Sequence, residues 1–145
     1  MSYFNVRVYG LLINENNEIL ISDEQSGGRT FSKFPGGGLE LGEGLIEALK
    51  REFMEECNAE IQVIEHLYTT DFYEQSSFND SQIISIYYLV RELKPLELHF
   101  KTLAFDFDEG TLQSFRWVPL DQLSTADVTF RTDQTVIELL LNRRK

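Results

Sequence analysis

The stretch Phe34–Ala59, FPGGGLELGEGLIEALKREFMEECNA, joins a glycine-rich loop directly to an acidic helix. The three consecutive glycines at 36–38 allow backbone conformations and close approaches that a Cβ atom would forbid. No helix breaker follows Gly44 until the end of the stretch. A helix is therefore predicted to begin there, with Gly44 as the N-cap and Glu47 as the carboxylate of a capping box.

This predicted helix has an apolar face and an acidic face. The apolar stripe, at helical spacing, consists of Ile46, Leu49, Phe53 and Cys57. The adjoining stripe consists of Leu45, Ala48, Glu52, Glu55 and Glu56. Carboxylates three and four residues apart repel each other, and a divalent cation would remove that repulsion. Clustered carboxylate oxygens suit Mg²⁺ or Mn²⁺. Glu47 and Arg51 are spaced as an ion pair, so Arg51 is expected to brace the acids without binding the cation.

The spacing resembles the signature of the MutT-like Nudix hydrolases, which reads Gly, five residues, Glu, seven residues, then Arg-Glu-apolar-x-Glu-Glu-x-Gly-apolar. In this chain it runs from Gly37 through Glu43 to residues 51–59. One position departs, because Asn58 stands where the family has glycine. Asparagine is the next best residue for the left-handed conformation that ends the helix, so the departure is expected to be tolerated.

The resemblance implies an α/β fold, a three-layer α/β/α sandwich with a mixed β-sheet, in a single Nudix domain over residues 1–145. It implies an Mg²⁺-dependent pyrophosphohydrolase that cleaves the diphosphate linkage of a nucleoside diphosphate derivative, such as a nucleoside triphosphate or ADP-ribose. One alternative is a catalytically silent Nudix-like module that binds a nucleotide as a sensor. Another is an interaction domain whose acids are only solvated surface. Many family members dimerise, which leaves room for a homodimer.

The site residues follow from the signature and its neighbours. The predicted catalytic residues are Arg51, Glu52, Glu55 and Glu56. The predicted metal ligands are Glu52, Glu55 and Glu56, with help from Glu40 or a glycine-loop carbonyl. The predicted substrate-binding residues are Lys33, Gly36, Gly37, Gly38, Tyr73 and Phe78. The general base is either a signature glutamate or an acid on a later loop, where the candidates are Asp106, Asp108 and Glu109; the alternative for those three is a solvated acidic loop.

Composition and charge exclude several classes of protein. The 145 residues carry a net charge of −11 with a pI near 4.6, which argues against binding nucleic acid or an anionic membrane. A phosphorylated small molecule remains compatible if divalent cations bridge the two sets of negative charges. The sequence has no long apolar run and no signal-peptide pattern at its start, so a cytoplasmic protein is expected. The single cysteine, Cys57, is expected to be a buried structural thiol.

Apolar alternation predicts the remaining elements. Strands are predicted at 3–13, 18–22, 30–34, 60–72, 81–93 and 113–119, with a further candidate at 96–100. Loops are predicted at 14–18, 25–29, 73–80 and 102–110, a helical turn at 120–123 and a helix at 131–144. Phe31 and Lys33 should share one strand face, which puts Lys33 near the glycine loop. Tyr73 and Phe78 either stack on a nucleobase or pack on the protein's own surface or in a dimer contact. His66 and His99 are expected to be structural residues on strands.

Overall fold

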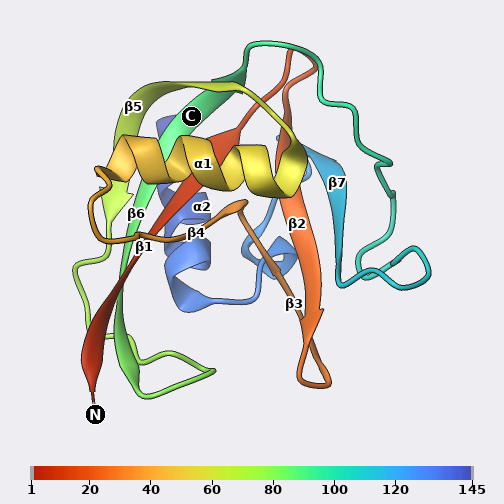
Figure 1. Cartoon of the computed structure of the whole chain (residues 1–145). Coiled ribbons are helices and arrows are strands. Elements are labelled where there is room, and N and C mark those ends of the chain that lie inside the picture. The colour runs from red at the N-terminus through yellow and green to blue at the C-terminus, as the bar shows by residue number, and fades with distance from the viewer. Residues whose placement is uncertain (1, 145) are drawn as a thin grey trace.

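The computed structural model describes residues 2–144, whose strands form two sheets between two helices (Figure 1). The elements are β1 (Tyr3–Leu12), β2 (Glu18–Ser26), β3 (Arg29–Lys33), β4 (Gly36–Gly38), α1 (Leu45–Cys57), β5 (Ile61–Thr69), β6 (Ser81–Glu92), β7 (Gln113–Pro119), the 3-10 helix η1 (Thr125–Asp127) and α2 (Arg131–Arg143). One sheet has the order β4-β1-β6-β5 and is mixed, because β1 and β6 run parallel. The other, β3-β2-β7, is antiparallel.

Successive side chains of β1 and β2 point to opposite faces of the β layer, and each face packs in its own hydrophobic core. Val8 and Leu20 pack in the cluster that contains Phe53 of α1. Their neighbours Tyr9 and Ile21 pack in the cluster that contains Ile137 of α2. The predicted three-layer α/β/α fold is thus confirmed, and its β layer consists of two sheets. Within residues 2–144, neither helix has the length and apolar content that crossing a membrane requires.

Several predicted boundaries were wrong. The predicted loop at 25–29 is mostly strand, because Gly27 and Gly28 alone, both with positive φ, turn β2 into β3. The glycine-rich loop is a short strand, β4, paired with β1. The segment 96–100 contributes only one bridge, from Phe100 to Phe115, rather than a strand. The short turn expected at 120–123 is present, closed by the hydrogen bond from the Leu123 N–H to the Leu120 carbonyl, and the 3-10 helix η1 follows it.

Helix α1 confirms the predicted caps and corrects the predicted apolar stripe. The Gly44 N–H donates to Glu47 Oε1 at 3.2 Å, and Asn58 adopts the left-handed conformation with φ of 49°. Ile46, however, is 44% exposed, because it lies in the first turn, ahead of the point where burial begins. Ala48, from the adjoining stripe, is fully buried in its place.

Candidate active site

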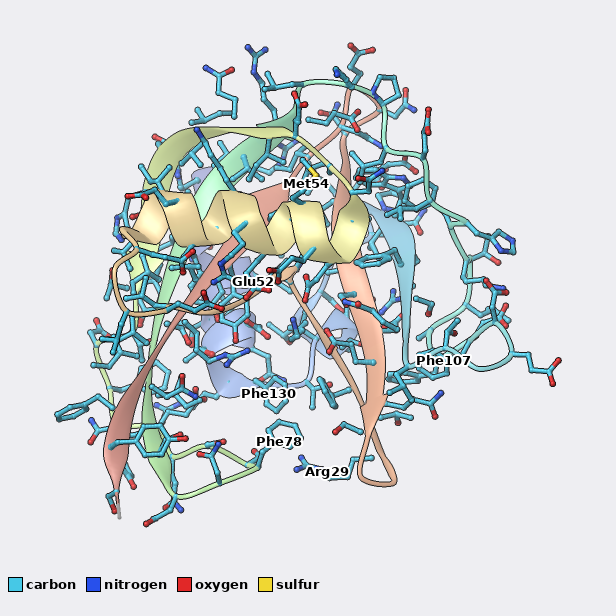
Figure 2. All side chains as sticks on the ribbon, viewed as in Figure 1. Arg29, Glu52, Met54, Phe78, Phe107 and Phe130 are labelled. Carbon is cyan, nitrogen blue, oxygen red and sulfur yellow. The ribbon has the colours of Figure 1, made fainter. Side chains whose placement is uncertain are left out.

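The glycines of β4 bring the backbone against the acidic face of α1. Gly36 has φ of +148°, and a Cβ there would lie 2.0 Å from the Val8 carbonyl oxygen. A Cβ on Gly37 would lie 2.6 Å from the Glu52 carboxylate. Figure 2 shows Glu52 on the side of α1 that faces β4. Larger residues at these two positions would force β1, β4 and α1 apart.

Arg51 joins several of the signature acids. Its Nε and Nη2 donate to the two oxygens of Glu43 at 2.6 and 2.8 Å. Its Nη1 donates to Glu52 at 3.0 Å and to Glu55 at 3.3 Å. Nη2 also donates to the Gly38 carbonyl at 3.0 Å, which ties the helix to β4. The Glu43 hydrogen bonds raise the pKa of Arg51 above its ordinary value, so it stays charged.

The ion pair predicted between Glu47 and Arg51 was wrong. Glu47 turns to the start of the helix, where it completes the capping box. Glu40 takes its place near Arg51, with 3.7 Å between its carboxylate and Nη1. One carboxylate, Glu47, therefore caps the helix, and another, Glu40, pairs with Arg51.

Glu56 lies apart from the Arg51 group, on the side toward β3. Its carboxylate accepts a hydrogen bond from the Gly36 N–H at 3.2 Å. Burial raises the pKa of Glu56 to about 7; the positive charge of Lys33 opposes this shift, and the negative charges of Glu24 and Glu52 add to it. Although burial alone would lower the pKa of Lys33, the charges of Glu56 and Glu24 raise it above its usual value.

The acidic site consists of Arg51 and five carboxylates, those of Glu40, Glu43, Glu52, Glu55 and Glu56. Its chemistry suits a hard divalent cation, although these side chains do not converge on one point. Among residues 2–144, no group of three or more acidic, histidine or cysteine side chains is arranged to hold an ion. The Arg51 guanidinium is nevertheless shared by four carboxylates, those of Glu40, Glu43, Glu52 and Glu55. This leaves an excess of negative charge, carried by oxygen ligands that Mg²⁺ and Mn²⁺ prefer. The side chains of Glu40 and Glu55 are more than half exposed, so they can reorient.

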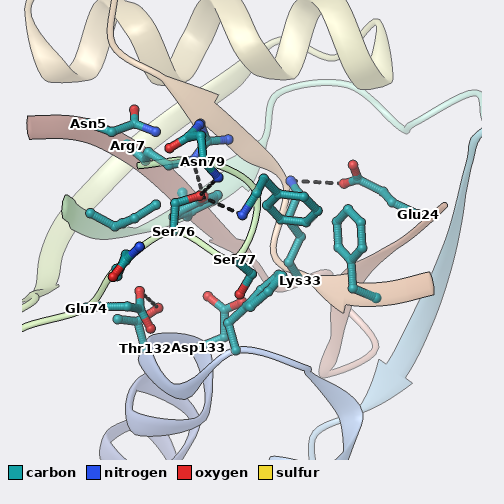
Figure 3. Close-up of a pocket in the computed structure, with 16 residues that line it drawn as sticks. Asn5, Arg7, Glu24, Lys33, Glu74, Ser76, Ser77, Asn79, Thr132 and Asp133 are labelled. Atoms are coloured by element: carbon teal, nitrogen blue, oxygen red, sulfur yellow. Dashed lines mark hydrogen bonds and ion pairs between the residues drawn. The ribbon is translucent and has the colours of Figure 1, made fainter. Parts of the chain in front are cut away.

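A cavity of about 310 Å³ lies beside the acidic site (Figure 3). Alternate residues of β1, namely Asn5, Arg7 and Tyr9, form one wall. Further wall residues are Glu24 of β2, Phe31 and Lys33 of β3, Glu74–Asn79, Ile83 of β6, Phe130, and Thr132 and Asp133 of α2. Lys33 joins the two regions: it lines the cavity, and its Nζ approaches the Gly36 carbonyl at 3.5 Å. The prediction that Phe31 and Lys33 share a strand face is confirmed.

Aromatic side chains close one end of the cavity. The Phe78 ring lies 5.3 Å from that of Phe31 and 6.2 Å from that of Phe130, between ring centres. The Arg29 guanidinium stands 4.7 Å from the Phe78 ring centre and donates to the Ser77 carbonyl. Phe78 therefore packs on the protein's own surface while lining the cavity. Tyr73, which was predicted alongside it, is 65% exposed and does not line the cavity.

A buried acid stands at the far wall, on α2. Tyr87 donates a short hydrogen bond to Asp133, and both residues are buried. Burial raises the pKa of Asp133 to about 7. Burial also raises the pKa of the Cys57 thiol, to about 12, which fits the predicted structural role of that residue.

The late-loop acids lie away from both regions. Asp108 accepts from Lys101 Nζ at 2.7 Å and from His99 at 3.1 Å, and Asp106 is 3.9 Å from the same Lys101 atom. None of Asp106, Asp108 and Glu109 lines the cavity. Their loop lies beside β7, near Phe107 in Figure 2, away from Glu52. The Lys101 hydrogen bond lowers the pKa of Asp108. His99 was wrongly expected on a strand, whereas His66 does lie in β5.

Sequence reasoning missed most of the cavity wall. The residues it did not single out are Asn5, Arg7, Tyr9, Glu24, Glu74, Gln75, Ser76, Ser77, Asn79, Ile83, Phe130, Thr132 and Asp133. The signal for three of them was available, because residues 5, 7 and 9 alternate along a strand and must share one face. An arginine between an asparagine and a tyrosine on that face points to a ligand or a partly buried partner. The contribution from α2 carries no local signal.

Comparisons with known proteins place this geometry in a family. The family model for the NUDIX domain matches residues 4–140. The Orf135 protein of E. coli has a similar structure, with a TM-score of 0.74 and 18% identity over 99% of this chain and 92% of that one. A MutT protein from Methanosarcina mazei Go1 gives 0.72 and 17% over 99% and 97%. An ADP-ribose pyrophosphatase from Streptococcus suis gives 0.63 and 15% over 97% and 92%. No curated protein sequence matches the chain. The chain belongs to the Nudix family of hydrolases, which act on diphosphate bonds.

Proposed function

We propose that this protein is a divalent-metal-dependent pyrophosphohydrolase that cleaves the diphosphate linkage of a nucleoside diphosphate derivative, a nucleoside triphosphate, ADP-ribose or a related compound. The observation that carries the proposal is that the cavity adjoins the acidic site through Lys33. Its volume of about 310 Å³ is in the range of small-ligand sites. A nucleoside in the cavity would lead its phosphates toward α1.

Glu52, Glu55 and Glu56 would hold Mg²⁺ or Mn²⁺, with Glu40 or a β4 carbonyl as a further ligand. Such an ion would neutralise charge on the phosphates and lower the pKa of a bound water. Arg51 holds Glu52 and Glu55 in position through its hydrogen bonds. Gly36 and Gly37 let the β4 backbone lie directly against the carboxylates of Glu56 and Glu52, which holds these acids in place. Phe31, Phe78 and Phe130 offer apolar surface to a base.

We propose a signature glutamate as the general base. The signature glutamates lie beside the cavity, where the Glu56 carboxylate accepts a hydrogen bond from the Gly36 N–H at 3.2 Å. Asp108 is less suited, because it already accepts hydrogen bonds from Lys101 and His99. Asp108→Asn should therefore leave kcat within roughly twofold of the parent. If Asp108→Asn lowered kcat as much as the loss of a signature acid is expected to, the general base would instead be an acid of the late loop.

A substrate panel tests the proposed function. Nucleoside triphosphates, ADP-ribose, dinucleoside polyphosphates and sugar nucleotides would be incubated with Mg²⁺, with Mn²⁺ and with a chelator, and the phosphate products measured. Turnover that disappears with the chelator and returns with the metal is the expected result. Nucleotide binding without turnover of any compound would favour the silent sensor module, and full hydrolysis in metal-free buffer would contradict the metal-dependent mechanism.

A further inference from the structure

Arg7 of β1 stands where the cavity meets the acidic site. It lines the cavity with Asn5 and Tyr9 (Figure 3). It is also the register partner of Gly38 in β4, and its Nη1 lies 3.7 Å from where a Gly38 Cβ would be. The Gly38 carbonyl accepts a hydrogen bond from Arg51. Arg7 thus faces the cavity and also lies next to Gly38, which contacts Arg51 of the acidic site.

The hydrogen bonding of Arg7 is incomplete. Its Nε donates to the Tyr9 hydroxyl at 2.6 Å, and its guanidinium carbon lies 5.7 Å from the centre of that ring. Among residues 2–144 this is the one side-chain hydrogen bond of Arg7, and it forms no ion pair there. A guanidinium has five N–H donors, so its Nη1 and Nη2 groups are available to a ligand.

The other arginines in comparable surroundings are differently placed. Arg51 contacts carboxylates through all three of its nitrogens. Arg116 is buried, and its Nε and Nη2 both donate to Asp23, at 2.7 and 3.3 Å. Arg7 differs from both, because its Nη1 and Nη2 groups have no acceptor among the described residues and stay open to water or to an anionic ligand.

Lys33 shows why Arg7 is the better candidate to bind that anion. Both cations lie against the Tyr9 ring, with Lys33 Nζ 5.4 Å from its centre. Lys33, however, is already paired with Glu24 at 3.0 Å and approaches two backbone carbonyls. The positive charge of Lys33 is therefore already balanced by a carboxylate of the protein. Arg7 offers a planar pair of donors, the geometry that binds phosphate oxygens through two parallel hydrogen bonds.

We propose that Arg7 binds the phosphoryl group attached to the nucleoside, and so selects nucleotides over diphosphates that lack a nucleoside. This inference rests on the nucleotide substrate proposed above. A nucleoside in the cavity presents its first phosphoryl group at the rim nearest β4, where Arg7 lies. The scissile linkage then extends to the acids of α1. Arg7 thereby fixes which end of the substrate enters the cavity.

The test compares nucleoside monophosphates with their nucleosides in metal-free buffer. AMP, GMP, CMP and UMP and the four parent nucleosides would be titrated into the protein by calorimetry. For the base that binds best, the monophosphate should bind roughly tenfold or more tightly than the nucleoside. Arg7→Gln should abolish that difference without changing nucleoside affinity, and Arg7→Lys should restore part of it. Lys50→Gln, which removes an exposed cation from α1, is the matched control and should change neither affinity.

Three outcomes would overturn the assignment: equal affinities of monophosphate and nucleoside in the parent, an unchanged monophosphate affinity in Arg7→Gln, or an equal loss of both ligands in that variant. Thermal melting of each variant shows whether it is folded, and Arg7→Lys keeps the test valid if Arg7→Gln is not. A parent that binds monophosphates through Arg7 but hydrolyses no nucleotide would refute the proposed hydrolase activity and leave this assignment standing.

Discussion

The acidic site and the cavity adjoin each other but are assembled in opposite ways. The acids, Arg51 and the glycines that contact them all come from the continuous segment 36–56. The cavity collects side chains from β1, β2, β3, β6, the 74–79 loop and α2. The first is fixed by helical spacing and one tight strand, and the second by packing between elements distant in sequence. The chemistry can therefore be common to a family while the substrate is set by residues that no local motif contains.

The largest effect is expected at the acids. Glu55→Gln and Glu56→Gln should each lower kcat about a hundredfold or more, since losing one preorganised electrostatic contact costs about 3–4 kcal/mol at the transition state. The free energy of unfolding should hold or rise, because like-charge repulsion is reduced. Turnover at low Mg²⁺ and thermal melting check both halves of the prediction. Glu138→Gln, on the exposed face of α2, is the control. Near-parental turnover in both variants would show that the metal site is not on this helix.

Arg51→Ala should have an intermediate effect on both stability and activity. The variant loses hydrogen bonds to Glu43, Glu52 and the Gly38 carbonyl, and leaves the acids repelling one another. We expect a loss of roughly 1–3 kcal/mol in the free energy of unfolding and a fall in kcat of about tenfold. Denaturant unfolding and steady-state kinetics measure the two, with Lys50→Ala on the same helix as the control. If the variant matched the parent in both, Arg51 would be an ordinary surface residue.

These two regions also show what a sequence can reveal. Helix α1, its caps and its acidic stripe were predictable, because spacing along one helix determines which side chains are neighbours. The partner of Arg51 was not, because Glu43 precedes the helix and only the path of the chain brings it there. Phe78 was identified as an aromatic on a loop, but its packing on Phe31 and Phe130 depends on β3 and α2. Nothing in the local sequence marks Asp133, because its burial depends on the packing of α2 against β6, where Tyr87 donates to it.

Asp133 allows a test of the cavity wall through pH. Its pKa is about 7 in the folded protein, against an ordinary value of 3.8, so the folded state holds this proton more tightly than the unfolded state. Its contribution to stability is therefore greatest at low pH and declines as pH rises toward 7. Asp133→Asn removes this decline. The variant's advantage over the parent in free energy of unfolding should grow between pH 5 and 7, by at most about 1.4 kcal/mol per pH unit.

Denaturant unfolding at pH 5, 6, 7 and 8 measures this trend, with the exposed Asp121→Asn as the control. The advantage should level off above pH 7. A difference between variant and parent that is the same at every pH would mean that the Asp133 carboxyl titrates normally and that its hydrogen bond with Tyr87 offsets the cost of burying its charge.

The smallest effect separates two aromatics of one loop. Phe78 lines the cavity and packs on Phe31, whereas Tyr73 is 65% exposed outside it. If a base stacks there, Phe78→Ala should raise KM by about fivefold, toward the low end of the 1–3 kcal/mol that stacking contributes in nucleic-acid binders. Tyr73→Ala should leave KM unchanged. Phe78→Ala also loosens the aromatic cluster, so a second variant, Phe78→Leu, is needed to separate packing from stacking. If KM rises in both variants while thermal stability falls only in Phe78→Ala, the Phe78 ring contacts the base. Unchanged KM in all three variants would take this loop out of the substrate site, and an equal rise in Tyr73→Ala would show that the loop acts through its conformation rather than through the ring of Phe78.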